Sequence, residues 1–261
     1  MGDHTDTRLS TEQLAQVLSL LRGSDGVELK VTVPDGNRRS AVASLGIDPL
    51  DAQIRQVAFF DTPDLVLNRN GIVVRARRIQ RKPGDVVVKL RPLVPDRVPK
   101  AVRRSPTFGV EVDAMPGGFV CSGTMKTERD DAAVKDAIAG RLALDELLSK
   151  EQRSLFSANA PEGLQLKELS VLGPINVLKL KFKPEGYSRR LVAELWLYPD
   201  GSRSLELSAK CQPIEAFEVA AETREFLAEH GVDLVAEQQT KTRAALQFFV
   251  DELTTVGANR E

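Results

Sequence analysis

Two arginines two residues apart, Arg75 and Arg77, are the side chains whose type and spacing most clearly predict chemistry. They follow a strand and a turn in the run FFDTPDLVLNRNGIVVRARR, residues 59–78. Successive side chains of a β-strand point to opposite faces, so the two guanidinium groups share one face while Val74 and Ala76 share the other. Guanidinium groups bind phosphate oxygens in bidentate fashion. We therefore expect this strand face to bind an anion.

Other predicted strands repeat the alternation of charged and apolar residues. The charged residues that share a strand face are Glu28 and Lys30, Lys89 and Arg91, Lys179, Lys181 and Lys183, and Glu206 and Lys210. A solvated sheet face explains any one of these strands, but such a face usually mixes signs and uncharged polar residues, whereas here cations recur at matched positions. We predict an α+β fold: an antiparallel eight-stranded β-barrel with a charged, water-filled interior and helices packed outside.

The scarcity of histidine and cysteine restricts the available chemistry. The chain has two of each among its 261 residues, and Cys121 and Cys211 show no CxxC spacing. This composition argues against a Ser-His-Asp triad, a Cys-His pair and a zinc site. Carboxylates, lysines and arginines remain as reacting groups, and carboxylate oxygens favour hard cations such as Mg²⁺ or Mn²⁺.

Four sequence motifs resemble those of the CYTH superfamily, the triphosphate tunnel metalloenzymes. Residues 59–78 resemble its aromatic-Asp-Thr-Pro turn followed by Arg-x-Arg. The runs VELK (27–30), VVVKL (86–90) and QQTKTRAAL (238–246) resemble its first-strand Glu-x-Glu-x-Lys motif, its lysine strand and its C-terminal helix. The resemblance implies metal-dependent hydrolysis of a triphosphate, inorganic or organic, inside a cationic tunnel. The same superfamily also includes adenylyl cyclases.

The resemblance, together with the strand patterns, implies two sets of site residues. The phosphate-binding set is Lys30, Arg75, Arg77, Lys89, Lys179, Lys181, Lys210 and Lys241. The metal-binding set is Glu28, Glu194 and Glu206, with Mg²⁺ or Mn²⁺ as the cofactor. Glu111 and Asp113 share a face of a further predicted strand and are alternative metal ligands, together with Glu194.

Two glutamates of the family pattern are replaced in this chain. Gly26 stands at the first glutamate of the first-strand motif, and Ser208 follows Glu206 where the family ends its barrel with Glu-x-Glu. Affinity for a hard cation rises with the number of charged oxygens that hold it, so these replacements weaken the expected metal site. The alternative function is therefore a barrel without catalysis that binds polyphosphate, a nucleotide or an acidic partner.

The expected organisation is a single domain over residues 1–261. It has an N-terminal helix at 10–22, strands between about 27 and 210, a helical insertion at about 128–157 and C-terminal helices at about 213–254. The prolines and the Gly117–Gly118 pair of segment 93–126 predict loops around one short strand at 108–112.

The expected partner is a small triphosphate or polyphosphate, and a homodimer is compatible with the sequence. A net charge of −1 argues against general binding to nucleic acid or membranes. A secretory signal pattern and long apolar runs are both missing, so we expect a cytoplasmic protein.

Overall fold

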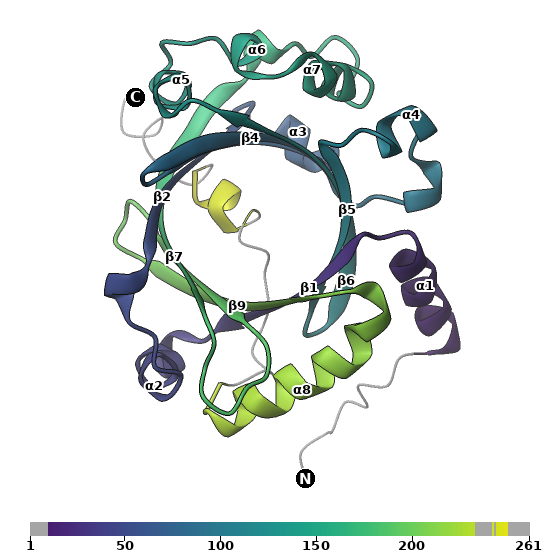
Figure 1. The fold of residues 1–261 in the computed structure, drawn as a ribbon. Coiled ribbons are helices and arrows are strands. Elements are labelled where there is room, and N and C mark those ends of the chain that lie inside the picture. Colours follow the sequence, from purple (N-terminus) through teal and green to yellow (C-terminus); the bar gives the residue numbers. More distant parts are fainter. Residues whose placement is uncertain (1–9, 233–241, 243, 250–261) are drawn as a thin grey trace.

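Nine β-strands close into a barrel in the part of the chain that the structure describes (Figure 1). The structure is a computed structural model that describes residues 10–232, 242 and 244–249. In order around the barrel, the strands are β1 (Gly26–Val33), β5 (Phe108–Met115), β6 (Gly118–Arg129), β4 (Lys82–Leu90), β3 (Ile72–Ile79), β2 (Gln53–Asp61), β7 (Ser170–Phe182), β8 (Leu191–Leu197) and β9 (Arg203–Cys211). The predicted closed barrel is confirmed.

The number and direction of the strands differ from the predicted eight antiparallel strands. β1 and β5 pair in parallel, with Gly26 opposite Glu111 and Glu28 opposite Asp113. The other neighbouring pairs are antiparallel. Strand directions cannot alternate all the way around a closed ring with an odd number of strands, so at least one pair must be parallel. The prediction of a fully antiparallel barrel was wrong for this reason.

Segment 93–126, expected to be mostly loops, contains most of a long hairpin. β5 and β6 pair from Phe108 opposite Met125 to Met115 opposite Gly118. The prolines of this segment and the Gly117–Gly118 pair led to the prediction of loops. Gly123 lies within β6, although glycine usually weakens a strand. A Cβ at Gly123 would lie 2.6 Å from the Phe108 ring. The glycine therefore allows that ring to pack directly against the strand.

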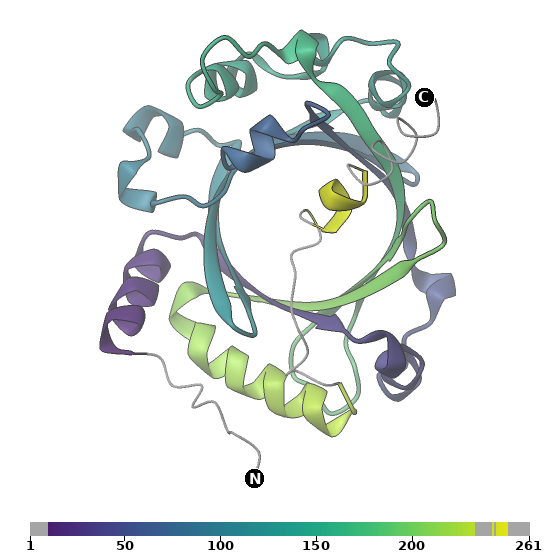
Figure 2. The ribbon, with the colours of Figure 1, turned by 180° about the vertical axis from the view of Figure 1, so that it is seen from behind.

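Helices surround the barrel, as predicted (Figures 1 and 2). They are α1 (Thr11–Arg22), α2 (Arg38–Ser44), α3 (Val66–Arg69), α4 (Lys100–Arg103), α5 (Asp131–Ile138), α6 (Leu144–Leu147), α7 (Lys150–Ser157) and α8 (Ala216–Glu229). Short 3-10 helices span Asp35–Asn37, Pro49–Asp51, Pro95–Arg97, Leu166–Glu168 and Pro213–Glu215. None of the described helices is long and apolar enough to cross a membrane.

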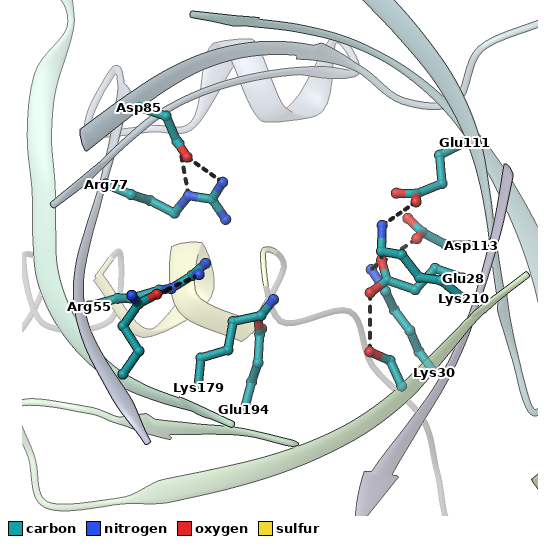
Figure 3. Close-up of polar contacts among 12 residues, drawn as sticks. Glu28, Lys30, Arg55, Arg77, Asp85, Glu111, Asp113, Lys179, Glu194 and Lys210 are labelled. Atoms are coloured by element: carbon teal, nitrogen blue, oxygen red, sulfur yellow. Dashed lines mark hydrogen bonds and ion pairs between the residues drawn. The ribbon is translucent and has the colours of Figure 1, made fainter. Parts of the chain in front are cut away.

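Toward the start of β1 the strands have an apolar outer face and a charged inner face, as their alternating sequences predict; the other end of the interior is apolar, against the expectation of a charged interior throughout. Val27 and Leu29 of β1 are buried in the outer core, which also contains residues of α1 and α8. Glu28 and Lys30, which alternate with them, point into the barrel (Figure 3). The barrel therefore packs its apolar side against the helices and keeps its charges inside.

Inside the ring lies the helical segment of residues 242 and 244–249, drawn in yellow (Figures 1 and 2). It belongs to a second hydrophobic core, which we call the inner apolar cluster, of Val57, Phe59, Leu65, Val73, Leu172, Ile175, Val177, Trp196, Tyr198, Ala245, Leu246 and Phe249. In the sheet, Trp196 of β8 lies opposite Ser204 of β9. The next residue of β9, Leu205, lies opposite Val33 at the end of β1. The cluster thus fills the barrel end where β1 finishes, and we call the opposite end the mouth. The predicted Lys241 lies outside the described residues.

A buried glutamine connects helix α7 to the barrel wall. Gln152 is 0% exposed, and its Nε2 donates hydrogen bonds to the backbone carbonyls of Val86 on β4, at 2.9 Å, and Met125 on β6, at 3.1 Å. Its Oε1 accepts from the backbone N–H of Ser149 at 3.0 Å, in a capping box. One side chain therefore links two strands and a helix start.

We expect Gln152→Met to lower the free energy of unfolding by about 1–3 kcal/mol, because it leaves buried polar groups without partners. Urea denaturation followed by circular dichroism measures this difference, with the exterior variant Arg141→Met as the control. Equal unfolding midpoints for Gln152→Met and the wild type would contradict the assigned role.

Candidate functional site

Charged side chains line the interior toward the mouth on facing walls of the barrel (Figure 3). On one wall Arg77 forms a two-pronged ion pair with Asp85, with distances of 2.8 and 2.7 Å from Nε and Nη2. Lys179 of β7 donates to Glu194 of β8 at 2.5 Å, because the two residues are directly opposite in the sheet. The predicted Arg77, Lys179 and Glu194 thus all lie in the interior.

Lys30 lies at the centre of the acidic groups on the other wall. Its Nζ is 3.1 Å from Glu28 Oε2 and 2.9 Å from Asp113 Oδ1. Burial lowers the pKa of Lys30, but Asp113, Glu28 and Glu206 more than offset this effect, so the pKa lies above its ordinary value. Lys30 is therefore a fixed, permanently charged ammonium group inside the barrel.

Asp113 is 0% exposed and is held by three cations. Lys30 and Arg91 form ion pairs with it, and Lys89 Nζ lies 3.6 Å from its Oδ2. Burial raises the pKa of Asp113, but these cations lower it well below the usual range. The carboxylate is therefore ionised throughout the physiological pH range.

Three carboxylates form a cluster, which we call the carboxylate cluster: Glu28, Glu111 and Asp113. Each offers an oxygen atom within 4.8 Å of the others. The parallel pairing of β1 with β5 produces this arrangement, because it places Glu28 beside Asp113 and Gly26 beside Glu111. An all-carboxylate set of this kind fits the oxygen preference of Mg²⁺ and Mn²⁺.

The carboxylate cluster differs from the metal-binding set expected from the sequence. It joins Glu28 to the alternative ligands Glu111 and Asp113, rather than to Glu194 and Glu206. The latter two face each other across β8 and β9, and Glu194 is bound by Lys179. Burial raises the pKa of Glu194, but Lys179, together with Arg77 and Lys30, lowers it to about 2.

The two replaced family positions lie beside the carboxylate cluster. Ser208 Oγ donates a hydrogen bond to Glu28 Oε1 at 3.1 Å, so a hydroxyl group takes the place of a second carboxylate. A Cβ at Gly26 would meet the carbonyl oxygen of Cys211 at 3.8 Å, which is an ordinary contact. The fold would therefore accept a side chain at position 26.

A cavity of about 70 Å³ lies deeper in the barrel, between the charged walls and the inner apolar cluster. It is lined by Lys30, Val73, Arg75, Val87, Lys89, Arg91, Met115, Trp196, Glu206 and Thr242. Three of these residues carry buried N–H groups without an acceptor among the described residues: Arg75 Nε, Arg91 Nε and Trp196 Nε1. Unsatisfied buried donors are costly, so their gathering around one cavity indicates a site for an anion.

Among the cations beside this cavity, Arg75 is the least compensated, whereas Lys30, Lys89 and Arg91 each lie within ion-pair distance of Asp113. Burial lowers the pKa of Arg75 to about 10, with a further lowering by Arg77, and no described carboxylate forms an ion pair with Arg75. Burial likewise lowers the pKa of Lys89 to about 8, although Asp113 opposes the shift. An incoming anion would relieve this loss of hydration, so both side chains are suited to bind one.

The predicted phosphate-binding residues do not all lie at one depth. Lys30, Arg75, Arg77, Lys89 and Lys179 are inside, and Lys210 lies at the mouth. Lys181 is exposed and lies opposite Val192 in the sheet, near the end of β7. Its place on the same strand face as Lys179 was correctly predicted, but this face meets solvent there.

Sequence reasoning missed several interior residues. Arg55 faces inward and its Nη2 donates to Gln53 Oε1 at 2.9 Å (Figure 3). It shares a strand face with Val57 and Phe59, and this concealed it, because apolar residues were expected to face outward. Asp85 could have been found from the hairpin register, because it lies directly opposite Arg77.

The fold is shared with solved structures. A putative adenylate cyclase from Bacillus halodurans superposes with a TM-score of 0.58 at 13% identity, covering 84% of this chain and 97% of that one. A putative adenylyl cyclase from Hippeastrum, described as having a dominant triphosphatase activity, gives 0.62 at 17% identity, covering 84% and 93%. No protein-family model and no curated protein matches the chain. At these identities the likeness shows the fold alone, and this shared barrel fold agrees with the one that the sequence motifs predicted.

We expect the affinity for tripolyphosphate to fall as the pH rises above about 8. Lys89 must be protonated to attract the anion, and its lowered pKa means that it loses its proton from about 8 upward. The loss reaches up to about tenfold per pH unit if Lys89 is essential for binding. Titration calorimetry between pH 7.5 and 9.5, without metal, measures it. Lys89→Arg stays charged and should flatten the profile, whereas identical profiles for both proteins would refute the assignment.

Proposed function

We propose that this chain binds a triphosphate, inorganic or organic, in the barrel interior and hydrolyses it. The observation that carries the proposal is the gathering of unpaired buried donors from Arg75, Arg91 and Trp196 around one cavity. The triphosphatase activity described for the Hippeastrum protein of the same fold supports the reaction type. With two histidines and two cysteines in the chain, the composition argues against a nucleophile of the Ser-His or Cys-His kind.

The barrel gives the phosphate chain one direction of entry. An open hollow of about 800 Å³ at the mouth is lined by Glu111, Lys126 and Lys210, among other residues. The opposite end is filled by the inner apolar cluster. A triphosphate would therefore enter at the mouth with its terminal phosphate leading toward Arg75 and Lys89.

The interior cations would bind the phosphate oxygens and offset the charge that spreads over them in the transition state. Phosphoryl transfer depends mainly on positioning and on electrostatic stabilisation, which groups fixed in advance provide. Arg75 offers an uncompensated guanidinium, and Lys30 is held in place by its ion pairs. Because both are buried, their attraction for phosphate is screened less than it would be in water.

Glu28, Glu111 and Asp113 would hold the divalent cation. When bound, such an ion polarises phosphoryl oxygens and makes water a stronger nucleophile. The carboxylates also keep the neighbouring lysines in position until substrate arrives.

A second candidate function is binding without turnover. Gly26 and Ser208 favour it, because the cations that attract a polyanion are present while two carboxylates of the family pattern are replaced. In this case the barrel would bind a polyphosphate or a nucleotide reversibly, without hydrolysing it.

Phosphate release from tripolyphosphate with Mg²⁺ or Mn²⁺ tests the proposed hydrolysis. We expect release by the wild type, its loss in Lys30→Ala with Arg75→Ala, and no change in Arg141→Ala, whose side chain pairs with Asp136 outside the barrel. Absence of release combined with a raised melting temperature in tripolyphosphate would favour binding alone. Absence of both effects would overturn both candidates.

Restoring a carboxylate at position 26 should strengthen metal binding. Gly26 lies opposite Glu111 and has room for a side chain, so Gly26→Glu would add a fourth carboxylate. We expect its affinity for Mn²⁺ to rise by about tenfold or more over the wild type. Gly26→Gln, of the same shape without the charge, is the control, and equal affinities for the two variants would refute the position of the site. Calorimetric titration with Mn²⁺ measures both.

A further inference from the structure

Lys210 lies against the carboxylate cluster at the mouth. Its Nζ forms an ion pair with Glu111 and lies 3.7 Å from Glu28 Oε2 (Figure 3). Its position on β9, directly opposite Glu28, aims the side chain at these oxygens. Two of the three carboxylates that could bind a metal ion are therefore already in contact with the same ammonium group.

This ammonium group can leave the cluster more easily than Lys30 can. The Lys210 side chain is 57% exposed in the hollow at the mouth, whereas that of Lys30 is 19% exposed and is fixed between Glu28 and Asp113. A lysine has a long, flexible stem, and its head can turn toward solvent without movement of the strand. Departure of Lys210 would free Glu28 and Glu111 on their solvent side.

A divalent cation and Lys210 compete for the same oxygens. The ammonium group offsets the negative charge that would attract the ion, and like charges at this spacing repel each other. A polyphosphate would change the balance, because its oxygens offer Lys210 a new partner in the same hollow. Once Lys210 binds the phosphate oxygens, Glu28 and Glu111 no longer have its positive charge beside them.

We propose that Lys210 is a tethered counter-cation that occupies the carboxylate cluster in the empty tunnel and is exchanged for a divalent cation when a polyphosphate binds. The exchange makes the two ligands cooperative: phosphate draws Lys210 away, and the ion takes its place at Glu28 and Glu111. By linkage, the bound ion must strengthen phosphate binding by the same factor. This inference rests on the proposed triphosphate site and adds how that site admits its metal.

Mn²⁺ binding in the absence of phosphate tests the competition directly. We expect Lys210→Met to bind Mn²⁺ about tenfold or more tightly than the wild type, since the competing charge is gone. Lys210→Arg keeps the charge and should bind as weakly as the wild type. Lys126→Met is the matched control: its lysine also lines the hollow at the mouth but pairs with Asp85, at 3.4 Å, outside the cluster. Melting temperatures establish that each variant is folded, and Lys210→Gln replaces Lys210→Met if that variant is not.

Inorganic phosphate is the probe for the coupling. Electron paramagnetic resonance of free Mn²⁺, corrected for its complex with phosphate, should show that phosphate tightens Mn²⁺ binding to the wild type and much less to Lys210→Met. Equal Mn²⁺ affinities for the wild type, Lys210→Met and Lys126→Met would overturn the exchange. These experiments measure no turnover, so their result is independent of hydrolysis. Exchange without phosphate release from tripolyphosphate would contradict only the proposed reaction. Phosphate release without any effect of Lys210 on Mn²⁺ binding would contradict only the exchange.

Discussion

The ion pairs of Lys30 with Asp113 and Glu28 are the interaction on which the rest of the interior depends. An ammonium group buried without partners costs several kcal/mol, so Lys30 can lie inside the barrel only because carboxylates surround it. These partners come from two strands that pair in parallel, and a shift of that pairing by one residue would turn Asp113 to the outer face. The register of β1 with β5 therefore decides whether Lys30 is compensated, and it also places the carboxylate that Lys89 and Arg91 contact.

The interior cations differ along the barrel in how fully carboxylates neutralise their charge, and this difference creates the site. Near the mouth, Arg77 and Lys179 each have a carboxylate partner of their own. Deeper in, Arg75 and Lys89 lie next to the inner apolar cluster, and burial lowers the pKa of both. At Arg75 an anion gains attraction that no ion pair with a described carboxylate has already neutralised. The apolar end, which includes residues 245, 246 and 249, also keeps the deep side of the cavity away from solvent.

The alternation of charged and apolar residues predicted the inward direction of several charged side chains, because a strand has only two faces. It placed Arg75, Arg77 and Lys89 correctly. It could not identify which strands are neighbours, since β1 and β5 are about eighty residues apart and pairing over that distance leaves no local pattern. The carboxylate cluster follows from that pairing, so Glu111 and Asp113 were only alternatives in the sequence. β6 was missed for a different reason, because the prolines and the glycine pair of segment 93–126 are typical of loops. The need for glycine at position 123 arises from the Phe108 ring on another strand, which the sequence does not show.

In the proposed function, the deep cavity binds a polyphosphate through donors that have no partner among the described residues. Trp196 is the single tryptophan of the chain and lines this cavity, so its fluorescence reports on occupancy. The most direct measurement is a titration of the metal-free protein with tripolyphosphate, for the wild type and Arg75→Met. The account predicts a saturable fluorescence change in the wild type and an affinity lower by about tenfold or more in the variant. A fluorescence signal that does not respond, or equal affinities in the two proteins, would contradict it.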